Sequence, residues 1–137
     1  MDTGSAFAAV NWLAVLVAAV STFVLGGLWY GPLFGKTWLA VTGIPEERLR
    51  EGNQGVIFGV SFVLELIAAV LLAMFLGPES TLAFGIFAGL SVGLGWVGTS
   101  LGVTYLFERR PLGHWGVNAG YQTVAFLIMG AILGAWH

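Results

Sequence analysis

One carboxylate, Glu65, lies in the middle of the apolar stretch SFVLELIAAVLLAMF, residues 61–75. An acidic residue at the centre of a membrane-spanning helix costs about 2.5 to 3.5 kcal/mol on insertion scales, so it is a functional candidate by default. No Lys or Arg lies within any apolar stretch of the chain to pair with it at that depth. The partners that remain are hydrogen-bonding groups, water, or a transported cation or proton.

Polar side chains recur in the other apolar stretches. Six of them complete a candidate proton, cation or solute path around Glu65: Asn11, Thr22, His114, Asn118, Tyr121 and Gln122. If neighbouring helices alternate in direction, Tyr121 and Gln122 come within about one helical turn of Glu65 in depth. The competing interpretation is that these groups only hydrogen-bond one another between helices, each bond contributing about 0.6 to 2 kcal/mol.

The composition identifies the element type that must position these residues. Of 137 residues, 58% are hydrophobic and only 9% are charged, and the mean hydropathy is +0.90. These values lie far outside the composition of a soluble globular domain. The chain is therefore predicted to be a membrane protein whose immediate partner is the lipid bilayer.

Little in the sequence points to catalysis. Without cysteine, the chain has no disulfide, thiolate metal site or cysteine nucleophile, and its two histidines are too few for a typical zinc site without carboxylates. No Ser-His-Asp spacing or phosphate-binding loop is present. GLGWVG, residues 93–98, matches a dinucleotide fingerprint but lies within an apolar helix. We expect no catalytic residues, metal, cofactor or nucleic-acid partner, and no enzyme activity.

Four stretches have the length of about 20 apolar residues needed to cross a bilayer. They cover residues 6–30, 54–76, 81–107 and 112–136, with proline- or glycine-containing breaks between them. The longest connection, residues 31–53, contains GIPEERLREGN, which predicts a brief solvent-side helix beginning near Pro45. The fold class is therefore all-α, a single four-helix transmembrane domain. Helical periodicity places Ala14, Ala18, Thr22 and Gly26 on the inward face of the first stretch and Phe23 on its lipid side.

The charge distribution predicts an orientation. All five basic residues lie in the connections 31–53 and 108–111: Lys36, Arg48, Arg50, Arg109 and Arg110. The positive-inside rule places both connections in the cytoplasm and both termini on the outer side of a cell (inner) membrane. Tryptophans and Tyr30 near the ends of the stretches are expected to form interfacial aromatic belts.

Glycines form several small-residue faces on the third and fourth stretches. Those assigned to close helix packing are Gly85, Gly89, Gly93, Gly98, Gly102, Gly116, Gly120, Gly130 and Gly134. Small residues let helix backbones approach closely within a bilayer. Because a four-helix monomer uses only some of these faces, the surplus predicts a homo-oligomer or contacts with other membrane subunits.

Two segments resemble one known family of small membrane proteins. Residues 11–43, NWLAVLVAAVSTFVLGGLWYGPLFGKTWLAVTG, resemble the opening signature of the domain of unknown function 1761 family, and residues 118–136, NAGYQTVAFLIMGAILGAW, are similar to its last helix. The resemblance implies four spans in a bacterial membrane and no established activity. The resemblance also implies that the position of Gln122 is often histidine. Because this chain has glutamine there, a role that requires a titrating imidazole at that position does not carry over to it.

Two functions follow from these observations. The first is a small oligomeric channel, or a proton- or cation-linked transporter, with Glu65 at its centre. The alternative is a structural or accessory subunit of a membrane complex, in which Glu65 is a protonated donor of an interhelical hydrogen bond. A visible absorption spectrum would reveal a bound pigment.

Overall fold

The computed structural model describes residues 2–137, and within that range the chain forms helices and no strands. The elements in chain order are α1 (Thr3–Ala8), α2 (Trp12–Leu28), η1 (Trp29–Leu33), α3 (Gly35–Thr42), α4 (Glu46–Leu49), α5 (Gln54–Leu76), α6 (Leu82–Leu90), η2 (Ser91–Gly98), α7 (Thr99–Phe107) and α8 (Leu112–Ala135). The segments η1 and η2 are π-helical. The predicted all-helical class is confirmed.

Four continuous helices are long and apolar enough to span a membrane: Trp12–Leu33, Gln54–Leu76, Leu82–Phe107 and Leu112–Ala135. The first begins later than the predicted residue 6, because α1 ends at Ala8 and a new helix begins after Asn11. The side-chain oxygen of Asn11 accepts a 3.1 Å hydrogen bond from the backbone N–H of Ala14. Such a cap satisfies an otherwise unpaired N–H at the start of a helix.

The connection from residue 34 to 53 contains more helix than the sequence predicted. The brief helix after Pro45 is present as α4. The helix α3, which was not predicted, follows η1. Pro32 lies within η1, and the backbone N–H of Phe34, just after it, donates to the carbonyl of Trp29 at 2.7 Å. Proline disrupts regular α-helical bonding, which accounts for the wider turn there.

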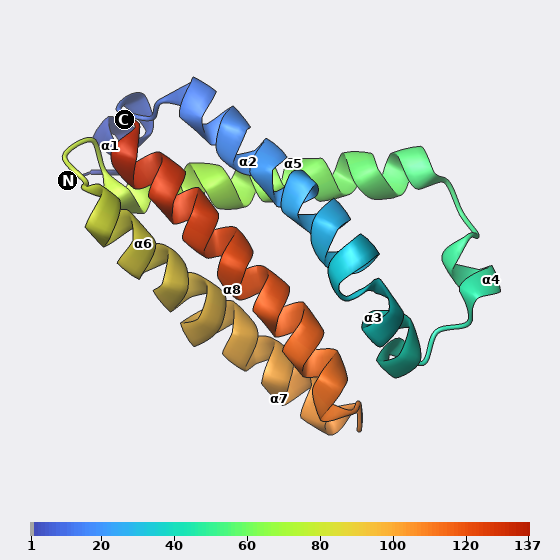
Figure 1. Ribbon diagram of the computed structural model, residues 1–137. Coiled ribbons are helices and arrows are strands. Elements are labelled where there is room, and N and C mark those ends of the chain that lie inside the picture. The colour runs from blue at the N-terminus through green and yellow to red at the C-terminus, as the bar shows by residue number, and fades with distance from the viewer. Residues whose placement is uncertain (1) are drawn as a thin grey trace.

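The helices α6 and α8 lie side by side along their length (Figure 1). Glycines on α6, on η2 and on α8 bring the backbones together. A Cβ added to Gly93 would lie 2.7 Å from the carbonyl oxygen of Gln122, and one added to Gly85 would overlap the carbonyl oxygen of Gly130. Side chains larger than hydrogen at these positions are therefore incompatible with this helix separation.

The bundle has two unlike ends. At the terminal end lie both chain termini and the turn between α5 and α6; at the loop end lie η1, the start of α5 and the turn between α7 and α8 (Figure 1). The apolar core belongs to the terminal half and comprises Val10, Ala14, Val15, Ala18, Ala69, Leu72, Leu76, Phe126, Met129 and Leu133. At the loop end the start of α5 stands apart from α2, and residues 54–60 are all exposed.

Candidate functional site

A cleft of about 540 Å³ separates α5 from α2 and η1 in the loop half of the bundle. Its lining comprises Thr22, Phe23, Gly26, Gly27, Tyr30 and Gly31 from α2 and η1, Ile57, Phe58, Ser61 and Glu65 from α5, and Tyr121 from α8. Small-molecule sites typically occupy about 300 to 1,000 Å³. The cleft is therefore large enough for a ligand of several rings.

The carboxyl group of Glu65 has no hydrogen-bonding or ionic partner among residues 2–137. The side chain is half-buried, so it is reachable from the cleft that it lines. Among the described lining residues, Glu65 is also the one acidic or basic side chain. Since an interhelical hydrogen bond from Glu65 was the alternative role, its lack of a partner favours an accessible site.

The other polar groups of the cleft are already engaged within the protein. The hydroxyl of Tyr121 donates to the carbonyl of Thr22 at 2.8 Å. The hydroxyl of Thr22 donates to the carbonyl of Ala19 at 2.7 Å, and that of Ser61 to the carbonyl of Ile57 at 2.7 Å. The cleft thus combines one free carboxyl group with walls whose hydroxyl donors are satisfied.

The cleft ends where the apolar core begins. One helical turn beyond Glu65, on α5, Ala69 is fully buried. The same step on α2 leads from Thr22 to Ala18, which is also fully buried. Residues four apart lie on the same helix face, so these alanines close the cleft toward the terminal end. Toward the terminal end, the faces of α2 and α5 that line the cleft therefore continue in buried alanines.

A second polar cluster lies between the cleft and the loop end. The hydroxyl of Tyr30 donates to Oδ1 of Asn118 at 2.6 Å, and Nδ2 of Asn118 donates to the hydroxyl of Tyr105 at 3.0 Å. The ring of Tyr30 lies 5.3 Å from that of Tyr121, centroid to centroid. The cluster therefore connects the cleft wall to the end of α7.

His114 belongs to the same cluster and is buried, with 5% of its surface exposed. Its Nε2 lies 3.3 Å from Nδ2 of Asn118, and its ring lies 4.5 Å from that of Tyr105. With Nε2 accepting from Asn118, the neutral ring carries its proton on Nδ1, which is buried without a partner in the described chain. This orphaned atom is the least satisfied polar group of the cluster.

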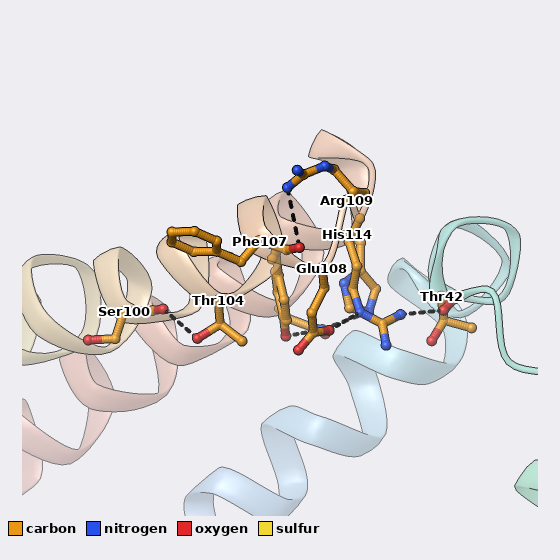
Figure 2. Close-up of polar contacts among 10 residues, drawn as sticks. Thr42, Ser100, Thr104, Phe107, Glu108, Arg109 and His114 are labelled. Atoms are coloured by element: carbon orange, nitrogen blue, oxygen red, sulfur yellow. Dashed lines mark hydrogen bonds and ion pairs between the residues drawn. The ribbon is translucent and has the colours of Figure 1, made fainter.

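The turn between α7 and α8 closes this region with charged groups. Arg110 donates from Nε to Glu108 at 2.7 Å and from a terminal nitrogen to the carbonyl of Thr42 at 2.8 Å. Figure 2 shows Glu108, His114 and Thr42 gathered where this turn meets α3. Arg109 adopts a left-handed backbone conformation, with φ of 60°, and caps α7 carbonyls through its side chain.

The structure brings together most, but not all, of the polar residues selected from the sequence. Glu65, Thr22 and Tyr121 line the cleft, and Asn118 and His114 form the adjoining cluster. Gln122 does not line the cleft, and its backbone carbonyl faces Gly93 of η2. Asn11 lies at the terminal end, where its side chain caps α2.

Tyr30 and Tyr105 are the polar residues that sequence reasoning missed. Tyr30 was assigned to an interfacial belt, yet it lines the cleft and bonds to Asn118. The signal available was the step of four residues from Gly26 to Tyr30, which places the tyrosine on the inward face predicted for that helix. Tyr105 has no comparable signal, because its partner Asn118 lies on another helix.

The glycines assigned to packing mostly lie against helices of the same chain. Gly85, Gly89, Gly93, Gly130 and Gly134 lie in the α6–η2–α8 contact, Gly98 faces Ala119, Gly102 faces Trp115, and Gly120 faces Trp29. A Cβ at Gly116 would meet no atom within 4 Å. Because contacts within one chain account for so many of them, the small residues no longer require an oligomer.

Comparison with known proteins yields one match. The sequence model of a family described as "Protein of unknown function (DUF1761)" matches residues 13–134. No curated protein and no solved structure matches the chain.

Proposed function

Since the chain belongs to the DUF1761 family, whose function is unknown, we propose from the geometry of the cleft that the protein is a proton- or cation-linked membrane transporter. The observation that carries this proposal is the carboxyl group of Glu65, which has no partner among residues 2–137 and is accessible in a cleft between helices long enough to span a membrane. An intramembrane acid without a partner has a desolvation cost that binding a proton or cation offsets.

A transporter fits this geometry better than a channel. A channel requires a continuous route, whereas this cleft ends at a core of small, fully buried side chains that includes Ala18 and Ala69. A site open on one side and sealed on the other is the arrangement that alternating access requires. Glu65 lies at the boundary between the open and the sealed halves.

The cluster of Tyr30, Asn118 and His114 adjoins the cleft on its loop-end side and supplies polar groups between Glu65 and that end of the bundle. Its groups are linked by hydrogen bonds of 2.6 to 3.3 Å. Tyr121 lies between the two sites, because it lines the cleft and its ring packs against Tyr30. Proton relays in membrane pumps and transporters consist of Asp, Glu and His side chains, and in this region Glu65 and His114 are the residues of that kind.

The alternative role as an accessory subunit has less support. It requires free glycine faces for docking, and glycines such as Gly98 and Gly130 face Ala119 and Gly85 of the same chain. It also gives no reason for a cleft at Glu65. The transport proposal needs one chain only and is independent of oligomeric state.

Proton flux into vesicles containing the purified protein and an internal pH-sensitive dye tests the proposal. Under an imposed pH gradient, the wild-type protein should dissipate the gradient faster than empty vesicles, and Glu65→Gln should remove this difference. Glu79→Gln is the matched control, because Glu79 lies in the exposed turn between α5 and α6. Equal flux through wild type and Glu65→Gln would show that Glu65 is not the transport site.

A further inference from the structure

The lining of the Glu65 cleft indicates the class of ligand it accepts. Four aromatic residues line the same cleft as Glu65: Phe23, Tyr30, Phe58 and Tyr121. They form two pairs, with centroids of Phe23 and Phe58 6.4 Å apart and those of Tyr30 and Tyr121 5.3 Å apart. Aromatic faces attract cations, and several of them together recognise quaternary ammonium groups.

The polar groups are arranged for a diffuse cation rather than a hard metal ion. Hard cations such as Ca²⁺ take about six to eight oxygen ligands, including several carboxylates or carbonyls. Glu65 supplies the cleft's one carboxylate, and residues 2–137 hold no cluster of three or more His, Cys, Asp or Glu side chains suited to a metal. A ligand with a spread positive charge and apolar substituents matches one carboxylate with aromatic walls.

The size of the cleft agrees with this chemistry. Three glycines, Gly26, Gly27 and Gly31, leave the α2 and η1 wall bare. A Cβ added to Gly27 or Gly31 would meet no atom within 4 Å, so these positions border open space. A site for a proton alone needs no such space.

We propose that the cleft binds a lipophilic organic monocation, an amine or quaternary onium with aromatic or branched apolar groups, through the carboxylate of Glu65 and the surrounding rings. The inference rests on the proposed function, since it names the substrate class of the same site. The cation and a proton compete for one carboxylate, so binding of either displaces the other. The other titratable groups of the lining are Tyr30 of η1 and Tyr121 of α8, and free tyrosine titrates only near pH 10.

Binding of tetraphenylphosphonium to the intact protein in a neutral detergent, measured by equilibrium dialysis against empty micelles, tests the inference. We expect saturable binding that weakens on acidification from pH 8 to pH 5. Glu65→Gln should reduce the affinity by about tenfold or more, because the cation loses its counter-charge. Tetraphenylborate, which has the same shape and the opposite charge, should show no binding that depends on Glu65.

Two leucine variants distinguish binding in the cleft from binding elsewhere on the protein surface. Gly27→Leu fills the cleft and should also reduce tetraphenylphosphonium affinity by about tenfold or more, as expected when a fitted pocket is overfilled. Gly59→Leu is its control, because a Cβ there also meets no atom within 4 Å but Gly59 does not line the cleft. If Glu65→Gln fails to elute as a folded species in size-exclusion chromatography, this pair of variants still decides the test.

The outcomes separate the two proposals. No saturable binding, or binding unchanged in both Glu65→Gln and Gly27→Leu, would overturn the inference; if Glu65-dependent proton flux persists in that case, the proposed function stands. Glu65-dependent binding without flux of either protons or the phosphonium would support the site and overturn the transport proposal.

Discussion

The hydroxyl of Tyr30 donates a 2.6 Å hydrogen bond to Oδ1 of Asn118, and so ties the end of the first long helix to the last one. The same amide donates to Tyr105 on the third long helix. One side chain thus connects three of the four helices, at the wall of the cleft.

Substitutions at Tyr30 and at Asn118 should both destabilise the fold, and their effects should depend on each other. Tyr30→Phe deletes one hydrogen bond and Asn118→Leu deletes all of them, so we expect losses of about 0.6 to 1.7 kcal/mol per bond in the free energy of unfolding. The two effects should not add, because the variants share one bond. Unfolding titrations in mixed detergent micelles measure the free energy of unfolding of the wild type, the two single variants and the double variant. Strict additivity would mean that the Tyr30–Asn118 bond contributes nothing.

Close contact between α6 and α8 makes glycine substitutions unequal. Gly85→Ala places a methyl group against the backbone of Gly130, whereas Gly116→Ala places it in open space. Overpacking costs about 1 to 3 kcal/mol, while alanine in an unobstructed helix position gains up to about 1 kcal/mol over glycine. Thermal unfolding in detergent should therefore rank Gly116→Ala above wild type and Gly85→Ala below it. Equal melting temperatures for the two variants would contradict the packing.

The chain contains no cysteine, so single cysteine variants report accessibility without background. A small, water-soluble cationic thiol reagent should label Ser61→Cys in the cleft and should not label Ala18→Cys in the sealed core. Rates should differ by at least about tenfold, because a thiol must be exposed to react as a thiolate. Rapid labelling of Ala18→Cys in vesicles would show that the terminal half is open to water.

The distribution of basic residues predicts the orientation of the chain in the membrane, and the same reagents test this prediction. Cysteine at Glu47, in the connection carrying Lys36, Arg48 and Arg50, should be protected from an impermeant reagent in intact bacterial cells. Cysteine at Glu79 should react at once. Both residues are exposed in the structure, so differences in burial do not confound the comparison. The reverse pattern would place the termini inside.

The helical class and the inward face of the first long helix could be predicted because hydropathy and helical periodicity are local properties. That face is confirmed: Ala14 and Ala18 are fully buried and Thr22 is 1% exposed. Phe23 was assigned to the lipid side, but it packs on Phe58 and Phe62. An aromatic side chain is compatible with either environment.

The cleft could not be predicted, because it depends on how the axes of α2 and α5 separate. The sequence grouped Gln122 with Tyr121, but adjacent residues on a helix point about 100° apart, and of these two residues Tyr121 is the one that lines the cleft. The helix α3 was missed for a related reason. It follows Pro32, and a proline usually predicts that a helix ends.

The contact between α6 and α8 also limits how the cleft can change its width. Glycine backbones touching over three helical turns resist sliding or separation, because any shift brings carbonyl groups into collision or opens a void. The first two turns of α5 have no such neighbour. A change in the width of the cleft that preserves the α6–α8 contact therefore requires a relative movement of α2 and α5, the helices that form its two walls.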